Sequence, residues 1–263
     1  MSGNRLLIVV PGISIFLAGC ATSDSIITEE GLPTPFSSQR GDLTPSIQWA
    51  SDWQLGEPDL IVKLSSPFSL PLENSDVFRN FVIPNVTASD HYVRALELKL
   101  DNREVVHHAE FLLDESDVSW RRDQEKPGAG FGGMDNTTAY HPDGHFVNWV
   151  PGKRASELPE GLAWRLPAQA DLVVQLHMMS SGFEEVIDPQ IGLYFADEPP
   201  KLSPQMIWLG SRWLPIAAGD PDFTTRDSYE LPFDIEVMSV LPHCHFICKN
   251  IEAWATLPDG SHQ

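Results

Sequence analysis

Short apolar segments, separated by proline, glycine, asparagine and aspartate, recur along the chain from Asp59 onward. None of them keeps the period of about 3.6 residues that marks a long amphipathic helix. The 22 prolines and 18 glycines supply turns at the density that antiparallel β-sandwiches need, so the pattern predicts an all-β fold. The predicted strands are Phe78–Pro84, His91–Leu100, Val105–Leu113, Leu172–Met179, Ile191–Ala196, Met206–Leu209, Phe233–Leu241 and Ile251–Thr256.

The acidic, proline-rich run Asp197-Glu198-Pro199-Pro200 is the clearest internal boundary. The segment before it, residues 59–198, is long enough for one complete β-sandwich. We therefore expect an N-terminal β-sandwich over residues 59–198 and a second, C-terminal sandwich region over residues 199–263. No internal repeat is visible in the sequence.

The N-terminus has the pattern of an exported protein. One cation, Arg5, precedes an apolar run from Leu6 to Leu17 that is too short to span a bilayer, which is typical of a secretory signal. The run ends in Leu17-Ala18-Gly19-Cys20, which resembles the lipobox of bacterial lipoproteins, where cleavage precedes an acylated cysteine. An ordinary secretory signal with an incidental cysteine is the alternative.

The lipobox-like run predicts a lipoprotein signal peptide over residues 1–19 and lipidation of Cys20. The segment that follows is rich in serine, threonine, proline and acids, so we expect residues 20–58 to form a flexible tether. Acyl chains on Cys20 would anchor the protein to a membrane of the bacterial cell envelope, facing the periplasm or the exterior.

Charge and cysteine content narrow the choice of partners. The formal net charge of -20 and the pI near 4.6 argue against nucleic acid or an anionic bilayer surface as a partner, because both are acidic themselves. Once Cys20 is acylated, only Cys244 and Cys248 remain, which is too few for a disulfide-stabilised scaffold. Each of these two thiols is either a soft ligand for Cu(I) or a small hydrophobic side chain.

Five histidines stand in groups that suit a metal site. His243 and His245 are two residues apart, so on an extended strand their side chains share a face with Cα atoms about 6.7 Å apart. His177 shares a strand face with Gln175 and Val173, opposite the more apolar face of Leu172–Met179. His107 and His108 are adjacent, so on a regular strand they face opposite ways, and both reach one ion only where a bulge or a strand end turns one ring.

An ordered set of motifs carries a family resemblance. The set is Val106-His107-His108, Trp149 with Pro151, Leu158-Pro159-Glu160-Gly161, Val174-Gln175-Leu176-His177 and His243-Cys244-His245. In order and spacing it resembles the copper type II, ascorbate-dependent monooxygenases, the family of the peptidylglycine α-hydroxylating and dopamine β-monooxygenases. Three further stretches, 78–84, 192–196 and 255–260, look more like bacterial members of this family. The resemblance covers roughly residues 60 to 263.

The resemblance implies a fold, two cofactors and a reaction. It implies two jelly-roll-like antiparallel β-sandwiches with one copper each, where His107, His108 and His177 hold the electron-transfer copper. His243 and His245 supply two of the three ligands of the oxygen-activating copper, whose remaining family ligand is a downstream methionine. The implied activity is hydroxylation of a C–H bond of a small substrate with O2, with ascorbate or another reductant as electron donor. Gln175 is implied to orient the His177 ring or a nearby water.

Two departures from the family pattern alter this expectation. All six methionines lie at or before Met238, so we expect a C-terminally truncated protein whose second sandwich is incomplete. Leu241 stands where the peptidylglycine enzymes carry an arginine, which disfavours a peptide with a C-terminal carboxylate as substrate. The alternatives are a non-catalytic copper-binding envelope lipoprotein and a β-sandwich adhesion or carbohydrate-binding module in which the histidines are incidental.

Overall fold

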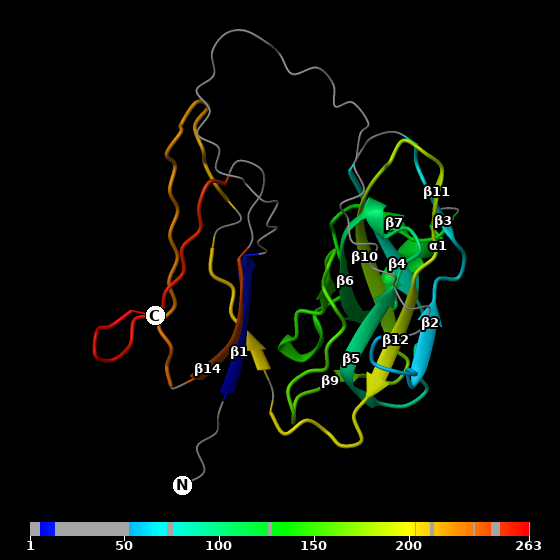
Figure 1. Cartoon of the computed structure of the whole chain (residues 1–263), viewed down its shortest axis with the longest axis horizontal. Helices are drawn as coiled ribbons and strands as arrows, with labels where there is room; N and C mark the ends of the chain where they lie inside the picture. Colours follow the sequence, from blue (N-terminus) through cyan, green and yellow to red (C-terminus); the bar gives the residue numbers. More distant parts are fainter. Residues whose placement is uncertain are drawn as a thin grey trace, which may run out of the picture.

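Antiparallel sheets make up most of the computed structural model, which describes residues 6–13, 53–72, 76–125, 128–202, 204–210, 213–233, 235–242 and 248–262. In these residues the regular structure is mostly β, with one α-helix, α1 (Val118–Gln124), and two short 3-10 turns, η1 (Arg103–Val105) and η2 (Pro142–Gly144). The predicted β class is therefore confirmed (Figure 1). No helix among the described residues is long and apolar enough to cross a membrane.

Two antiparallel sheets form one body, which we call the two-sheet body (residues 59–198). The five-stranded sheet has the order β7 (Phe131–Gly132), β4 (Asp76–Ile83), β10 (Asp171–Met179), β6 (Val106–Asp114) and β8 (Asn148–Trp149). The four-stranded sheet has the order β2 (Leu60–Lys63), β12 (Gln190–Phe195), β5 (His91–Lys99) and β9 (Trp164–Leu166). A short ribbon pairs β3 (Phe68–Leu70) with β11 (Glu185–Ile187).

The core lies between these two sheets. On β10 the predicted alternation holds, because Leu172, Val174, Leu176 and Met178 are all buried in one apolar cluster. The same cluster takes in side chains from the four-stranded sheet, among them Leu193. The opposite face of β10 carries Val173, Gln175 and His177, and there only Val173 joins a smaller apolar cluster. One face of β10 is thus apolar and packs against the core, while the opposite face is partly polar and points away from the core.

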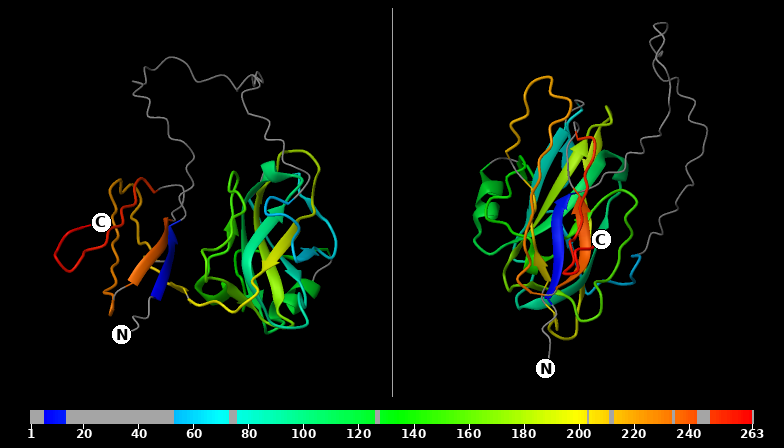
Figure 2. Two further views of the ribbon diagram at one scale, coloured as in Figure 1. Left: turned by 60° about the horizontal axis from the view of Figure 1, so that its bottom comes forward. Right: turned by 90° about the vertical axis from the view of Figure 1, so that its left-hand side faces the viewer.

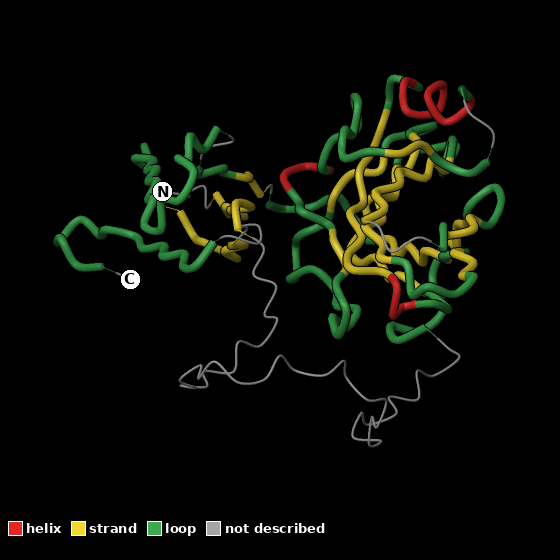
Figure 3. Tube along the Cα trace, turned by 90° about the horizontal axis from the view of Figure 1, so that it is seen from above, coloured by secondary structure: helices red, strands yellow, loops and turns green. Residues whose placement is uncertain are grey.

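The C-terminal region, residues 199–262, is built differently. Its strands β13 (Pro204–Met206) and β14 (Ile235–Pro242) both pair in parallel with β1 (Leu6–Ile13), which lies between them. Figures 1 and 2 show this three-stranded sheet beside the two-sheet body, with the chain crossing over after β12. Figure 3 shows the same separation from above, with most strands on the side of the two-sheet body.

Strand predictions fail mainly in this region. Met206–Leu209 is not a strand, because β13 ends at Met206. Ile251–Thr256 was also a wrong prediction, since the described residues there form only an isolated bridge between Thr256 and His262. An apolar run becomes a strand only when a neighbouring backbone accepts and donates its hydrogen bonds, and in this run Thr256 alone has such a described partner. The predicted signal peptide and tether lie largely outside the described residues.

Candidate metal centre

A β-bulge brings the adjacent histidines to the same side of the sheet. In the pairing of β6 with β10, His108 lies opposite His177, whereas Val106 lies opposite Met178, so His107 is one extra residue in β6. Val106 and Ala109 are both buried in the core, and two residues rather than one stand between them. The bulge therefore leaves His107 and His108 both on the outward face, which is the face of His177.

The three imidazoles converge at this bulge. One ring nitrogen from each of His107, His108 and His177 lies within 4.8 Å of the other two, and these are the only described residues that form such a metal-holding group. The Nδ1 atoms of His107 and His177 are 3.2 Å apart. The ring centroids of His108 and His177 are 4.9 Å apart, as are those of His107 and His177, while those of His107 and His108 are 5.7 Å apart. The grouping of these three residues is thus a property of the fold.

Two residues of β4 hold the His177 ring. Phe78 lies opposite His177 in the strand register and stacks on its ring, with centroids 4.0 Å apart and ring planes 9° apart. Oδ1 of Asp76 lies 3.3 Å from Nε2 of His177. His177 is buried to 9 % exposure, while its neighbour His107 is exposed to solvent. The ring is thus fixed on one face by an aromatic side chain and at one edge by a carboxylate.

The carboxylate selects the form of the His177 ring that can bind a metal. When Nε2–H donates to Asp76, the proton is at Nε2 and the Nδ1 lone pair is directed toward His107. Metal-bound histidines typically donate their second ring N–H to a carboxylate or carbonyl in this way, which fixes both tautomer and orientation. The contact between Asp76 and His177 therefore prepares Nδ1 as a ligand atom.

The cluster fits a metal ion of the class that imidazoles bind. Ligand nitrogens about 2.0–2.1 Å from a common ion are separated by about 3.3–3.6 Å in trigonal or tetrahedral sets. The 3.2 Å separation of two Nδ1 atoms and the 4.8 Å limit for all three ligand atoms are close to this range, so small ring rotations complete the set. Neutral imidazole is a good ligand for copper and zinc, and a set of three leaves positions open for a further ligand.

Gln175, predicted to orient the His177 ring or a nearby water, is held by two asparagine side chains. Its Nε2 donates to Oδ1 of Asn80 at 2.8 Å and to Oδ1 of Asn136 at 2.5 Å. Asn80 in turn donates to the carbonyl of Gly133. These bonds connect β10 to β4 and to the loop after β7, at a position two residues before His177 on the same strand. Among the described residues, Asp76, Phe78, His107 and His108 contact His177.

Sequence reasoning missed Asp76 and Phe78. Each lies about 100 positions before His177, and only the antiparallel register of β4 with β10 brings them together. A signal was present in the predicted strand Phe78–Pro84, because a strand paired with Leu172–Met179 must put one of its residues opposite His177. The order of strands in the sheet was needed to identify which one.

His243, His245 and Cys20 all lie outside the described residues. Cys248 is described and is disulfide-bonded, so it does not act as a thiolate ligand in this structure. Of the other histidines, His91 stacks on Phe195 with ring centroids 4.2 Å apart and is not part of the cluster.

Comparison with known proteins adds no assignment to this geometry. No protein-family model matches the chain, and a search of curated proteins returned no match.

Proposed function

We propose that this chain is a copper-dependent, monooxygenase-like protein that hydroxylates a C–H bond of a small substrate with O2 and ascorbate or another reductant. The observation that carries the proposal is the bulge in β6, which brings His107 and His108 to His177. A bulge is what allows the rings of two adjacent strand residues to reach one ion. The motif order of the sequence supplies the rest of the proposal, including two jelly-roll-like sandwiches.

In this proposal His107, His108 and His177 hold the electron-transfer copper. Bound copper supplies one-electron chemistry between its +1 and +2 states, for which an all-imidazole set is suitable. Asp76 keeps the proton of His177 at Nε2, and Phe78 prevents the ring from turning away. The exposed ring of His107 leaves one side of the cluster accessible to a soluble reductant such as ascorbate.

The oxygen-using copper is assigned to His243 and His245 on the resemblance alone. A small molecule is the proposed substrate, since Leu241 offers no charge for a substrate carboxylate. The cell envelope is the proposed location, with the lipid anchor on Cys20. Cleavage before Cys20 would remove β1 from the sheet that it forms with β13 and β14, so the mature protein would have to pair those strands in another way.

A non-catalytic copper-binding lipoprotein is the second candidate function. One observation favours it: residues of β6 and β10 form the whole three-histidine cluster, and the C-terminal region contributes nothing to it among the described residues. Such a cluster is sufficient to bind copper without a second metal. The two candidates differ in whether bound copper supports O2 consumption.

The experiment combines a copper titration with an oxygen electrode. The chain is titrated anaerobically with Cu(I) against a competing chelator, and ascorbate-dependent O2 uptake is then recorded. We expect His177→Ala to lose the tight copper, whereas His91→Ala, a matched histidine outside the cluster, keeps it. Loss of O2 uptake in His243→Ala with the first copper retained supports the monooxygenase. Tight copper without any O2 uptake supports the binding protein, and wild-type copper affinity in His177→Ala contradicts both.

A further inference from the structure

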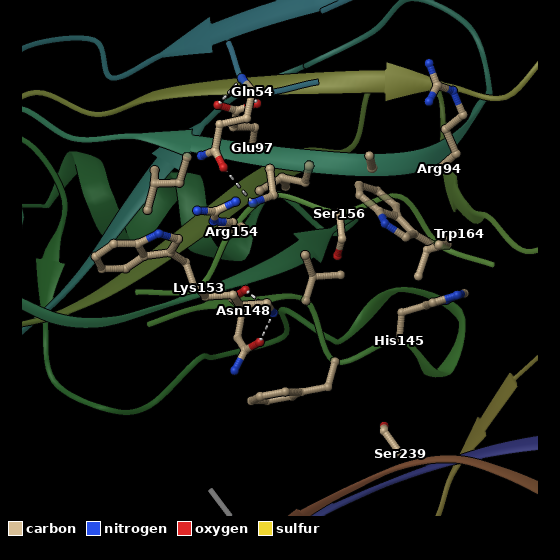
Figure 4. Close-up of a pocket in the computed structure, with 18 of the residues that line it drawn as sticks. Gln54, Arg94, Glu97, His145, Asn148, Lys153, Arg154, Ser156, Trp164 and Ser239 are labelled. Carbon is tan, nitrogen blue, oxygen red and sulfur yellow. Dashed lines mark hydrogen bonds between the residues drawn. The ribbon is translucent and has the colours of Figure 1, made fainter. Parts of the chain in front are cut away.

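A cavity of about 220 Å³ lies at one edge of the two-sheet body. It is lined by residues of β5, by β8 and β9, which are the terminal strands of the two sheets, and by the loop that follows β8. Ser239 of β14 closes it on the side of the C-terminal region (Figure 4). None of the three clustered histidines lines this cavity, so it is separate from the candidate metal centre.

The cavity has a cationic mouth. Lys153 and Arg154 both line it and are exposed, in a chain whose formal net charge is -20. Nζ of Lys153 donates to the backbone oxygen and to Oδ1 of Asn148, at 2.8 Å and 2.7 Å, and both of these acceptors are uncharged. These two bonds do not neutralise an ammonium charge. The protein around Nζ lowers the pKa of Lys153 by desolvation, and an anion beside Nζ would favour the charged form again. A local excess of positive charge on an acidic protein attracts small anions.

The other two charged groups of the lining, Arg94 and Glu97, make contacts of their own. Arg94 forms an ion pair with Glu157. The carboxylate of Glu97 accepts hydrogen bonds from the backbone N–H groups of Gln54 and Leu55 and from the hydroxyl of Tyr194. Glu97 is thus turned toward the chain before β2, and the cations of the lining that stand outside a described ion pair are Lys153 and Arg154.

The far side of the cavity is apolar, with one buried imidazole. Trp164 is 2 % exposed and lies with His145 on the side away from Lys153 and Arg154 (Figure 4). His145 is 4 % exposed, and its ring nitrogens make no hydrogen bond of standard geometry to the described residues. Burial lowers the pKa of His145, with partial opposition from the Pro142 carbonyl, so the ring is neutral at neutral pH and offers one donor and one acceptor.

We propose that this cavity binds a small organic carboxylate, with its carboxylate between Lys153 and Arg154 and its apolar body against Trp164. The size is appropriate, because an engineered apolar cavity of about 150 Å³ holds benzene. A volume of about 220 Å³ therefore accommodates a ring that carries one small charged substituent. Charge-assisted hydrogen bonds to the carboxylate and burial of the ring against tryptophan both favour this class of ligand.

The test uses benzoate as the probe and benzamide, its uncharged counterpart, as the matched ligand. Both are titrated into the full chain by calorimetry in the presence of a chelator, so the result does not depend on bound copper or on the proposed function. We expect benzoate to bind more tightly than benzamide. The double variant Lys153→Gln/Arg154→Gln should weaken benzoate at least about tenfold and leave benzamide unchanged. Arg121→Gln, which alters an exposed cation of α1 paired with Asp117, should change neither.

A second variant tests the cavity itself. Ser156 is exposed and lines the cavity, so Ser156→Trp fills the space without disturbing the core, and it should abolish binding of both ligands. Circular dichroism establishes that each variant is folded. Equal affinities for benzoate and benzamide, unchanged benzoate binding in the Lys153→Gln/Arg154→Gln variant, or no benzoate binding to the wild-type chain would each overturn the proposal.

Discussion

The two-sheet body buries its large apolar side chains, whereas the C-terminal region exposes many of its own. In the two-sheet body, large apolar side chains such as Phe111 and Leu176 are at most 1 % exposed. In the C-terminal region, Trp213 is 80 % exposed and Trp254 is 56 % exposed. The described residues of the C-terminal region contribute nothing to either buried apolar cluster.

This difference explains where a metal centre can be placed. A ligand set needs rings that are held to within about 0.5 Å, and only packed, hydrogen-bonded elements hold them so closely. His177 lies on the central strand of the five-stranded sheet, flanked by β4 and β6. Strand β14, which precedes His243 and His245, has exposed side chains at Val237 and Val240. The proposed electron-transfer site is therefore built on buried strands, whereas the strand that leads to the second proposed site is largely exposed.

The largest expected effect is on the free energy of unfolding, which should respond differently to a truncated side chain in each region. Phe111→Ala removes a side chain that is 1 % exposed, so we expect it to lower the free energy of unfolding by about 3–5 kcal/mol. Val240→Ala shortens a side chain that is 51 % exposed, and we expect a change within about 0.5 kcal/mol. Urea denaturation followed by circular dichroism measures both. Similar losses in the two variants would show that the regions share one cooperative core.

The next effect concerns the carboxylate beside the metal centre. Asp76→Asn removes the charge that holds the His177 proton at Nε2, and we expect copper affinity to fall by about 10–100-fold. The matched control is Asp90→Asn, because Asp90 is paired with Arg165 and does not contact the cluster. Competition titration with a copper chelator compares the variants. Equal affinities would mean that Asp76 does not position the ligand.

A smaller effect, with a defined pH dependence, comes from Asp114 at the end of β6. Burial alone would raise the pKa of Asp114, but hydrogen bonds from Ser116 and Ser119 outweigh it and hold the pKa well below the usual range. A carboxyl whose pKa is lowered by folding adds stability above its unfolded pKa of about 4 and loses it as the pH falls toward the folded value.

Asp114→Asn should therefore lower the free energy of unfolding by about 1–2 kcal/mol at neutral pH. The difference from the wild-type chain should shrink as the pH falls below about 4. Asp135→Asn is a useful comparison, since Asp135 is an exposed carboxylate paired with Arg122. Urea titrations at several pH values measure the trend, and a constant difference down to acid pH would show that the ionised form of Asp114 is not what stabilises the fold.

The smallest expected effect is on copper binding when the C-terminal region is removed. A fragment of residues 53–200 contains β2 to β12 and all three clustered histidines. Because Asp76 and Phe78, which fix the His177 ring, also lie within this segment, we expect its copper affinity to equal that of the full chain. A clear loss of affinity in a folded fragment would show that the C-terminal region supports the site.

These comparisons also show what the sequence alone could predict. The alternation on Leu172–Met179 predicted both the strand and the outward face of His177, because a period of two is visible in one segment. The sequence did not decide whether a bulge occurs at His107, because the bulge depends on the pairing of β6 with β10. The contacts of Asp76 and Phe78 with His177 could not be predicted either, because they depend on the pairing of β4 with β10. Ile251–Thr256 was misassigned because apolar composition does not indicate whether a neighbouring strand exists.

The central claim is that His107, His108 and His177 bind one copper ion. X-ray absorption at the copper edge, on the full chain loaded with one equivalent of copper, tests it most directly. We expect three imidazole nitrogens at about 2.0 Å from the metal, with one fewer in His177→Ala. A spectrum with fewer than three imidazole nitrogens, or one that is the same in His177→Ala as in the wild-type chain, would contradict it.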